Sequence, residues 1–345
     1  MDSLYLAVGT VVLLAVVVDV IWTTLWVDGG SGPLSARLTT WTWYGLRRAS
    51  DDRGLLGVAG PLVLSLTLAM WIGLLWLGWT LLFAGGSPAL LSTQTGEPAS
   101  WTGRIYYVAY TMFTNGNGDY TPAGGVWEIA SSFTTATGMA FVTLGISYVV
   151  TVLGAVSEKR SFASDVTGLG DRPESFVRTG WDETEGEFGE LGLPLESLAN
   201  DLSLLADKHK AYPVLHYYHS DQPSRASAVA VPILDEALTI LESGVEPADR
   251  PDPVLLASAR SSVDTYLDTL ETAFIDPADE VPPAPDLDRL REDSIGTVED
   301  RTLERAVSEI EDRRRRLLGI ARADAWEWPP VGEDESRATT HQPDP

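Results

Sequence analysis

Residues 111–122, Thr-Met-Phe-Thr-Asn-Gly-Asn-Gly-Asp-Tyr-Thr-Pro, form a short polar segment between two long apolar runs. The runs cover 55–83 and 126–156, and the first contains no charged residue. Each is longer than the ~20 residues with which a helix crosses a bilayer core. Irregular backbone at membrane depth is tolerated only where it is buried in protein or lines a water-filled path. The segment therefore predicts a re-entrant loop between two membrane spans.

A third apolar run, 4–27, precedes these two and is also long enough to span a bilayer. It lacks the basic start and the small-residue cleavage site of a signal peptide. The connector 28–54 carries four arginines, whereas the loop 84–104 carries only Arg104. Because short cytoplasmic loops are enriched in Lys and Arg, we expect a multi-pass cell-membrane protein. Its N-terminus lies outside, its glycine loop opens outward, and residues from 157 onward are cytoplasmic.

Charge divides the chain into a membrane half and a soluble half. Residues 1–156 carry eight acidic and five basic residues, and 157–345 carry 41 acidic and 19 basic residues. A net charge of −25 argues against nucleic acid as a partner, because nucleic-acid binders present a basic patch. The acid-rich composition with only three lysines is typical of halophile proteins, in which salt screens self-repulsion. An ordinary acidic protein from a high-GC organism is the alternative. Without cysteine the chain has no disulfide and no thiolate chemistry.

The order Thr-x-x-Thr-x-Gly-x-Gly-Asp-x-x-Pro over 111–122 resembles the pore loop of the tetrameric potassium-channel superfamily. Such a filter replaces the hydration shell of K⁺ with rings of backbone carbonyls. Successive carbonyls point at one axis only if the backbone alternates with left-handed angles, which glycine adopts without steric cost. The resemblance implies a pore helix over 105–113, a homotetramer in the lipid bilayer and K⁺ as the conducted ion, with no cofactor. It assigns ion binding to the filter residues and the outer mouth to Asp119; the filter residues are Thr114, Asn115, Gly116, Asn117 and Gly118.

Two residues of the loop depart from the superfamily pattern. Asn115 stands where an aliphatic residue is usual, and Asn117 stands where an aromatic or aliphatic one is usual. Amides behind the filter need hydrogen-bond partners. If these are missing, the filter is less rigid and selects less well, so the choice between potassium and sodium stays open. The Gly-Asn-Gly-Asp order resembles a microbial branch of single-loop channels. In that branch a stretch similar to 159–163, Lys-Arg-Ser-Phe-Ala, follows the inner helix.

Several residues of the spans have two interpretations. Gly138 and Gly145 are candidate gating hinges, although glycine in membrane helices more often permits close packing. Thr134, Thr135 and Thr137 either line a cavity below the filter or join helices by hydrogen bonds. Asp19, an ionisable group within a span, suggests function by default. Because the first span is expected to lie away from the pore, we predict a structural hydrogen bond from Asp19 to a neighbouring helix.

The soluble half has a helical period in its apolar residues. One stripe runs from Leu195 to Ala206, a second from Val263 to Phe274, and a third along one charged helix from Leu303 to Ala321. The run 313–316, four arginines with acidic neighbours, predicts a solvated, salt-bridged helix. His216 and His219 have the spacing of metal ligands, but without a third ligand aromatic packing is the preferred interpretation.

The predicted fold is an all-α membrane protein with three transmembrane helices, a re-entrant pore helix and filter loop, and a helical cytoplasmic domain. Its parts are 1–54 (first span and basic connector), 55–156 (pore module), 157–328 (acidic helical domain) and 329–345 (a disordered tail). No motif of an enzyme is present, and the cytoplasmic ligand stays unknown. Passive potassium conduction is the predicted function. The alternatives are a non-selective or sodium-permeable channel and a membrane-anchored sensor or scaffold with a silent pore.

Overall fold

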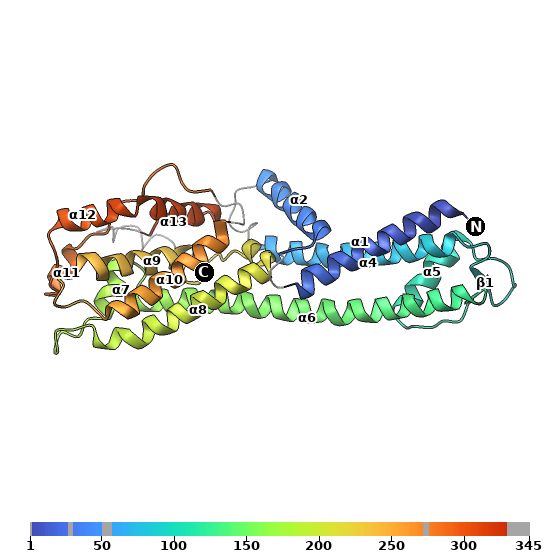
Figure 1. The fold of residues 1–345 in the computed structure, drawn as a ribbon, viewed down its shortest axis with the longest axis horizontal. Coiled ribbons are helices and arrows are strands. Elements are labelled where there is room, and N and C mark those ends of the chain that lie inside the picture. Colours follow the sequence, from blue (N-terminus) through green and yellow to red (C-terminus); the bar gives the residue numbers. More distant parts are fainter. Residues whose placement is uncertain (1, 27–29, 50–56, 272–275, 330–345) are drawn as a thin grey trace, which may run out of the picture. The chain divides into compact units, whose positions relative to one another are not determined.

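The computed structural model describes residues 2–26, 30–49, 57–271 and 276–329, which form two compact units (Figure 1). The first unit contains residues up to 49, 59–154 and 210–217, and the second contains 57–58, 155–209 and the described residues from 218 onward. Among the described residues, three helices are long and apolar enough to cross a membrane. These are α1 (Ser3–Leu25), α4 (Ala59–Ala84) and α6 (Val126–Leu169). The predicted all-α membrane fold is confirmed.

Helices α1 and α4 pack closely along each other because small residues face each other at the crossing. A Cβ on Gly9 would lie 2.9 Å from the carbonyl oxygen of Gly78. Small residues of this kind let two backbones approach within a membrane, where van der Waals packing drives association. The start of α1 is capped by Asp2, whose carboxylate accepts from the Leu4 N–H at 3.1 Å.

The connector after α1 contains a helix that the sequence analysis did not predict. Helix α2 (Pro33–Ala49) is the next helix in the chain, and Gly30, three residues before it, has φ +66°. Arginines interrupt the apolar residues of α2, so the segment lacks the long apolar run that predicts a span. The sequence therefore predicts only a polar connector here. The predicted connector residue Arg53 lies outside the described residues.

The outer segment between α4 and α6 holds the pore helix and a small sheet. Strand β1 (Leu90–Ser92) pairs antiparallel with β2 (Tyr120–Pro122), with Leu91 opposite Thr121. Helix α5 (Trp101–Met112) begins four residues before the predicted 105, because Ser100 caps it by accepting from the Gly103 N–H at 3.1 Å. The loop predicted over 84–104 therefore contains a strand that holds the far end of the glycine loop.

The second unit is helical, as predicted, and its helices surround one buried helix. It comprises the end of α6, α7 (Pro173–Thr179), α8 (Gly192–Ala211) as far as residue 209, α9 (Ser227–Thr239), α10 (Pro253–Glu271), α11 (Asp288–Glu292), α12 (Asp300–Glu309) and α13 (Glu311–Ala323), with short helical turns between them. Helix α9 is buried on nearly every side. The apolar stripe from Leu195 to Ala206 lies in the core; Phe274 and 330–345 lie outside the described residues.

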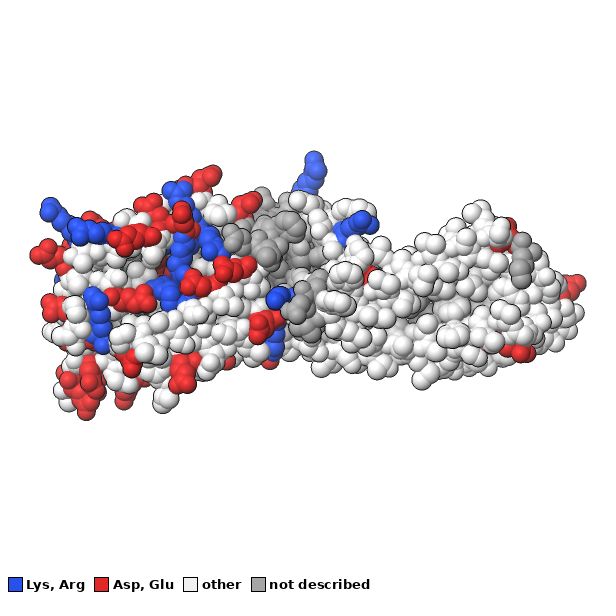
Figure 2. Space-filling view, viewed as in Figure 1, with Lys and Arg blue, Asp and Glu red and all other residues white. Residues whose placement is uncertain are grey.

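Charge follows this division into units. On the face in Figure 2, acidic and basic side chains cover the second unit densely, and the spans present an almost uncharged surface. Two sequence predictions differ from the structure here. The span predicted to end at 156 belongs to a helix that continues to Leu169, because the apolar run passes directly into helical residues of the second unit. The single helix predicted from Leu303 to Ala321 is broken at Ile310, whose φ of −114° and ψ of 20° are not helical.

Candidate functional site

The glycine loop has an alternating backbone. Thr114, Gly116 and Gly118 have φ values of +62°, +60° and +80°, whereas Asn115 and Asn117 between them have negative φ. Left-handed angles at Gly116 and Gly118 are those expected from the sequence. Thr114 extends the alternation, although a β-branched residue rarely has positive φ. Backbone strain of this kind persists where the surroundings impose it, often at functional sites.

Most carbonyls of the loop have no protein donor. Among the described residues, none donates a hydrogen bond to the carbonyl oxygens of 114–117. The Gly118 carbonyl differs, because the Thr93 hydroxyl donates to it at 2.9 Å. The loop residues 113–118 are exposed in the single chain. The loop therefore presents four consecutive carbonyls with unused acceptor capacity, and its outer end is held by the segment after β1.

A chain of hydrogen bonds joins the loop side chains to the pore helix. The Asn115 amide donates to the Asn117 side-chain oxygen at 2.9 Å. Asn117 donates to the Tyr106 hydroxyl at 2.5 Å, and that hydroxyl donates to Asp119 Oδ2 at 3.0 Å. Both asparagine side chains therefore have hydrogen-bond partners. Asp119, the predicted outer-mouth residue, is held at the outer end of the same chain.

Helix α5 is also fixed to the two spans beside it. The Trp76 indole donates to the Ile105 carbonyl at 2.9 Å, and the Thr135 hydroxyl donates to the Thr111 carbonyl at 3.3 Å. The Trp79 indole donates to the Thr137 hydroxyl at 2.9 Å. Of the two interpretations of these threonines, Thr135 and Thr137 form hydrogen bonds between helices. Thr134 is buried and donates to Ala130 of its own helix.

The two candidate hinge glycines have different surroundings. A Cβ on Gly138 would lie 2.0 Å from the carbonyl oxygen of Met112, the last residue of α5. A Cβ on Gly145 would meet its nearest atom, Cδ2 of Leu68, at 3.6 Å. Gly138 therefore lets α6 approach the base of the pore helix, and Gly145 is not required by packing. Their predicted part in gating stays a prediction.

Asp19 is buried and serves structure, as predicted. Its Oδ1 accepts from the backbone N–H groups of Leu34 and Ser35 at 2.7 and 3.2 Å. Its Oδ2 accepts from the Ser35 hydroxyl and from the Trp71 indole, the latter at 2.8 Å. A carboxylate so supplied with donors is stable at membrane depth. Asp19 thus caps the start of α2 and ties α1 to α4; Gly32 is needed beside it, because a Cβ there would lie 2.4 Å from Oδ1.

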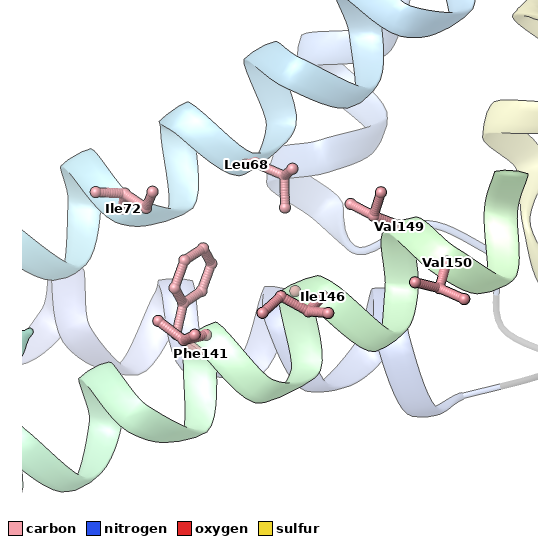
Figure 3. Close-up of a pocket in the computed structure, with 8 residues that line it drawn as sticks. Leu68, Ile72, Phe141, Ile146, Val149 and Val150 are labelled. Atoms are coloured by element: carbon pink, nitrogen blue, oxygen red, sulfur yellow. The ribbon is translucent and has the colours of Figure 1, made fainter.

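An apolar groove lies between α4 and α6 (Figure 3). It has a volume of about 280 Å³. The lining residues carry no charge and come from both helices: Leu68 and Ile72 from α4, and Phe141, Val142, Gly145, Ile146, Val149 and Val150 from α6. A wall of this kind offers no ligand to an ion, and the groove is part of the apolar surface of α4 and α6.

In the structure, the histidine pair and the arginine run at 313–316 have different surroundings. Among the described residues no group of three His, Cys, Asp or Glu could hold a metal ion. The His216 ring lies 5.3 Å from that of Tyr217, as aromatic packing requires. The solvated helix at 313–316 is wrong for Arg314, which is 1% exposed and pairs with buried Glu236, Nε to Oε1 at 2.7 Å. The partner is 78 residues away, so local sequence gave no sign of it.

Comparison with known proteins agrees with this architecture. Residues 67–155, which contain α5, the glycine loop and most of α4 and α6, match a family described as an ion channel. This part of the chain is therefore similar to an ion-channel module. Over 330 residues it is 42% identical to the uncharacterized membrane protein YdjJ of Bacillus subtilis (strain 168), covering 95% of this chain and 96% of that protein. The chain belongs to the same family as YdjJ. No solved structure matches it.

Proposed function

We propose that the protein conducts potassium passively through a homotetrameric pore, with the filter formed by residues 114–118. The observation that carries the proposal is the alternation of φ at Thr114, Gly116 and Gly118, together with the unpartnered carbonyls of 114–117. Carbonyl rings of this kind replace the hydration shell of K⁺. The Thr114 hydroxyl supplies the innermost ring. Gly118, whose carbonyl is occupied by Thr93, serves to turn the chain toward the outer mouth.

The single loop of each chain supports an oligomeric pore, and the resemblance to tetrameric channels suggests four copies. A single chain contributes one loop, which is exposed and cannot surround an axis by itself. Four copies related by rotation enclose a path and bring four Asp119 carboxylates to its outer mouth. Closed cyclic symmetry of this kind is common among homo-oligomers. With the arginine-rich connector inside, the loop opens to the outside and the second unit is cytoplasmic. Flow down a gradient needs no catalytic group.

A non-selective cation channel is the second candidate, and the amides of Asn115 and Asn117 favour it. Amides are more polar than the usual apolar packing behind a filter, and water could loosen the filter there. The hydrogen-bond chain from Asn115 to Asp119 through Tyr106 opposes such loosening. Selectivity for potassium therefore depends on Tyr106, the one member of the chain that lies on the pore helix.

The test is the reversal potential of the purified protein in a planar bilayer, with potassium on one side and sodium on the other. A reversal near the potassium equilibrium potential supports the proposal, and one near zero assigns the protein to the non-selective class. Tyr106→Phe keeps the ring but removes the hydroxyl, and should move the reversal toward zero. Tyr107→Phe is the matched control, since Tyr107 bonds to Ser131 of α6 and not to the loop. Absence of current from folded tetramers under all salts would count against conduction.

A further inference from the structure

Helix α2 carries a stripe of exposed aromatic and basic residues, which we call the α2 stripe: Arg37, Trp41, Tyr44 and Arg48. At about 100° per residue these four positions fall within roughly 60° of the helix circumference. Trp41 is 71% exposed and Tyr44 is 68% exposed, and both arginines are exposed. Two large exposed aromatic side chains that lie side by side on one helix face, with an arginine on either side, form a patch of the kind that marks an interaction site.

The opposite face of α2 is already occupied by the protein. Ser35 and Thr39 are buried, and the Trp43 ring packs edge-on against Tyr217 at 5.4 Å between ring centroids. The helix is therefore held in one rotation about its axis. That rotation turns the α2 stripe away from the rest of the first unit, so the stripe is available to a partner.

The start of α2 is fixed at the level where α1 leaves the membrane. Asp19, which caps α2, lies six residues before the end of α1 at Leu25, about 9 Å along the helix. Trp22 and Trp26, at the same end of α1, are exposed and stack at 5.8 Å. Exposed tryptophans at the end of a span typically sit at the membrane–water interface. Figure 1 shows that α2 turns away from α1 and α4 here and does not run beside them.

The charge of this segment is opposite to that of the chain. Residues 30–49 contain three arginines and no acidic residue, in a chain of net charge −25. Basic residues flanking aromatic ones on an interfacial helix bind the phosphates of anionic lipids, and the rings enter the headgroup boundary. A second copy of the stripe is an unsuitable partner, because a symmetric contact would place arginines against arginines.

We propose that the α2 stripe docks on anionic phospholipid headgroups of the leaflet in which α1 ends. Trp41 and Tyr44 enter the boundary between headgroups and acyl chains, and Arg37 and Arg48 bind phosphate. Because α2 is tied to α1 by Asp19 and leads to α4, this contact sets the depth and tilt of both spans. The proposal depends on α1 and α4 spanning the membrane, and not on the ion that the pore conducts.

The test uses the absence of native cysteine in the full-length chain. Gly45→Cys places a label beside Trp41 and leaves the stripe intact, because nothing lies within 4 Å of a Cβ there. The protein, with a fluorescent label on this cysteine, is reconstituted in phosphatidylcholine vesicles with or without phosphatidylglycerol. The quenching of the fluorescence by spin-labelled lipid is then measured. Thr265→Cys, exposed on α10, is the control label. We expect strong quenching at position 45 that increases with phosphatidylglycerol, and none at 265.

The charge requirement is tested in the same assay. Replacing Arg37 and Arg48 together by Gln should weaken the docked state roughly 30-fold at a given anionic lipid content. Replacing Arg301 and Arg305 of α12 by Gln is the control, since both are also exposed. It removes the same charge from another helix and should leave the quenching at position 45 unchanged. The proposal is overturned if the label at position 45 is not quenched in either kind of vesicle. It is also overturned if the quenching depends neither on phosphatidylglycerol nor on the two arginines. It is likewise overturned if, without the label, a disulfide at position 45 joins separate tetramers in dilute vesicles.

Discussion

Replacing Gly138 by alanine should push α6 away from the pore helix α5. The new Cβ would lie 2.0 Å from the Met112 carbonyl oxygen, whereas ordinary contact begins near 3.4 Å. Backbone atoms of two packed helices would have to part by more than 1 Å to accommodate it. Overpacking of this kind costs about 1–3 kcal/mol per chain. In a tetramer the same penalty applies four times, so about 4–12 kcal/mol opposes the assembled pore.

Gly145→Ala is the matched control on the same helix. Its nearest neighbour would be Cδ2 of Leu68 at 3.6 Å, which is ordinary van der Waals contact. Alanine in a helix is more favourable than glycine by roughly 0.5–1 kcal/mol, so this variant should be as stable as the parent or slightly more stable. The two substitutions add the same methyl group and differ only in what it meets.

The assay combines thermal unfolding of the purified protein, followed by tryptophan fluorescence, with cation flux into vesicles. Gly138→Ala should unfold at lower temperature and conduct little or nothing, and Gly145→Ala should unfold as the parent does. Parental stability and flux in Gly138→Ala would refute the close approach of α6 to Met112. A loss of flux in Gly145→Ala without loss of stability would instead identify Gly145 as a hinge.

Three further predictions concern the buried carboxylates and the acidic unit. Asp19→Asn should destabilise the first unit by about 2–4 kcal/mol, because the side-chain NH₂ would replace Oδ2 and could not accept the hydrogen bond from the Trp71 N–H. An unchanged thermal stability would contradict this. Burial raises the pKa of Asp235, but the charges of Arg260 and Arg313 outweigh burial and hold that pKa below its usual value. The ionised Asp235 therefore stabilises the fold fully above about pH 4, and this stabilisation is lost as pH falls through the lowered pKa. Asp235→Asn should cost about 3–5 kcal/mol near neutral pH, and the deficit should shrink in acid; a deficit independent of pH in denaturant titrations would exclude the charge as its cause. If the acidic composition is a halophile trait, the melting temperature of the full-length protein should fall as salt is lowered from molar values, and a salt-independent value would refute it.

Arg314 is buried, although the sequence pattern at 313–316 predicts an exposed helix. A run of arginines with acidic neighbours usually marks a solvated helix, since local pairs in water are worth little. Here Arg314 faces inward and also donates to the carbonyls of Pro282 and Pro283 at 2.9 and 2.6 Å. The partner Glu236 lies on α9, a helix that is buried on nearly every side. No pattern within a few residues of Arg314 could indicate that contact.

The amino-acid sequence by itself determined the three spans and the left-handed positions at Gly116 and Gly118. Length, apolar runs and glycine spacing are local properties, and local physics translates them directly into helices and turns. The tertiary structure decided which groups meet. It supplied Tyr106 as the partner of Asn117, four donors around Asp19, and the exposed face of α2. These outcomes depend on contacts between distant segments, and such contacts arise only when the helices pack.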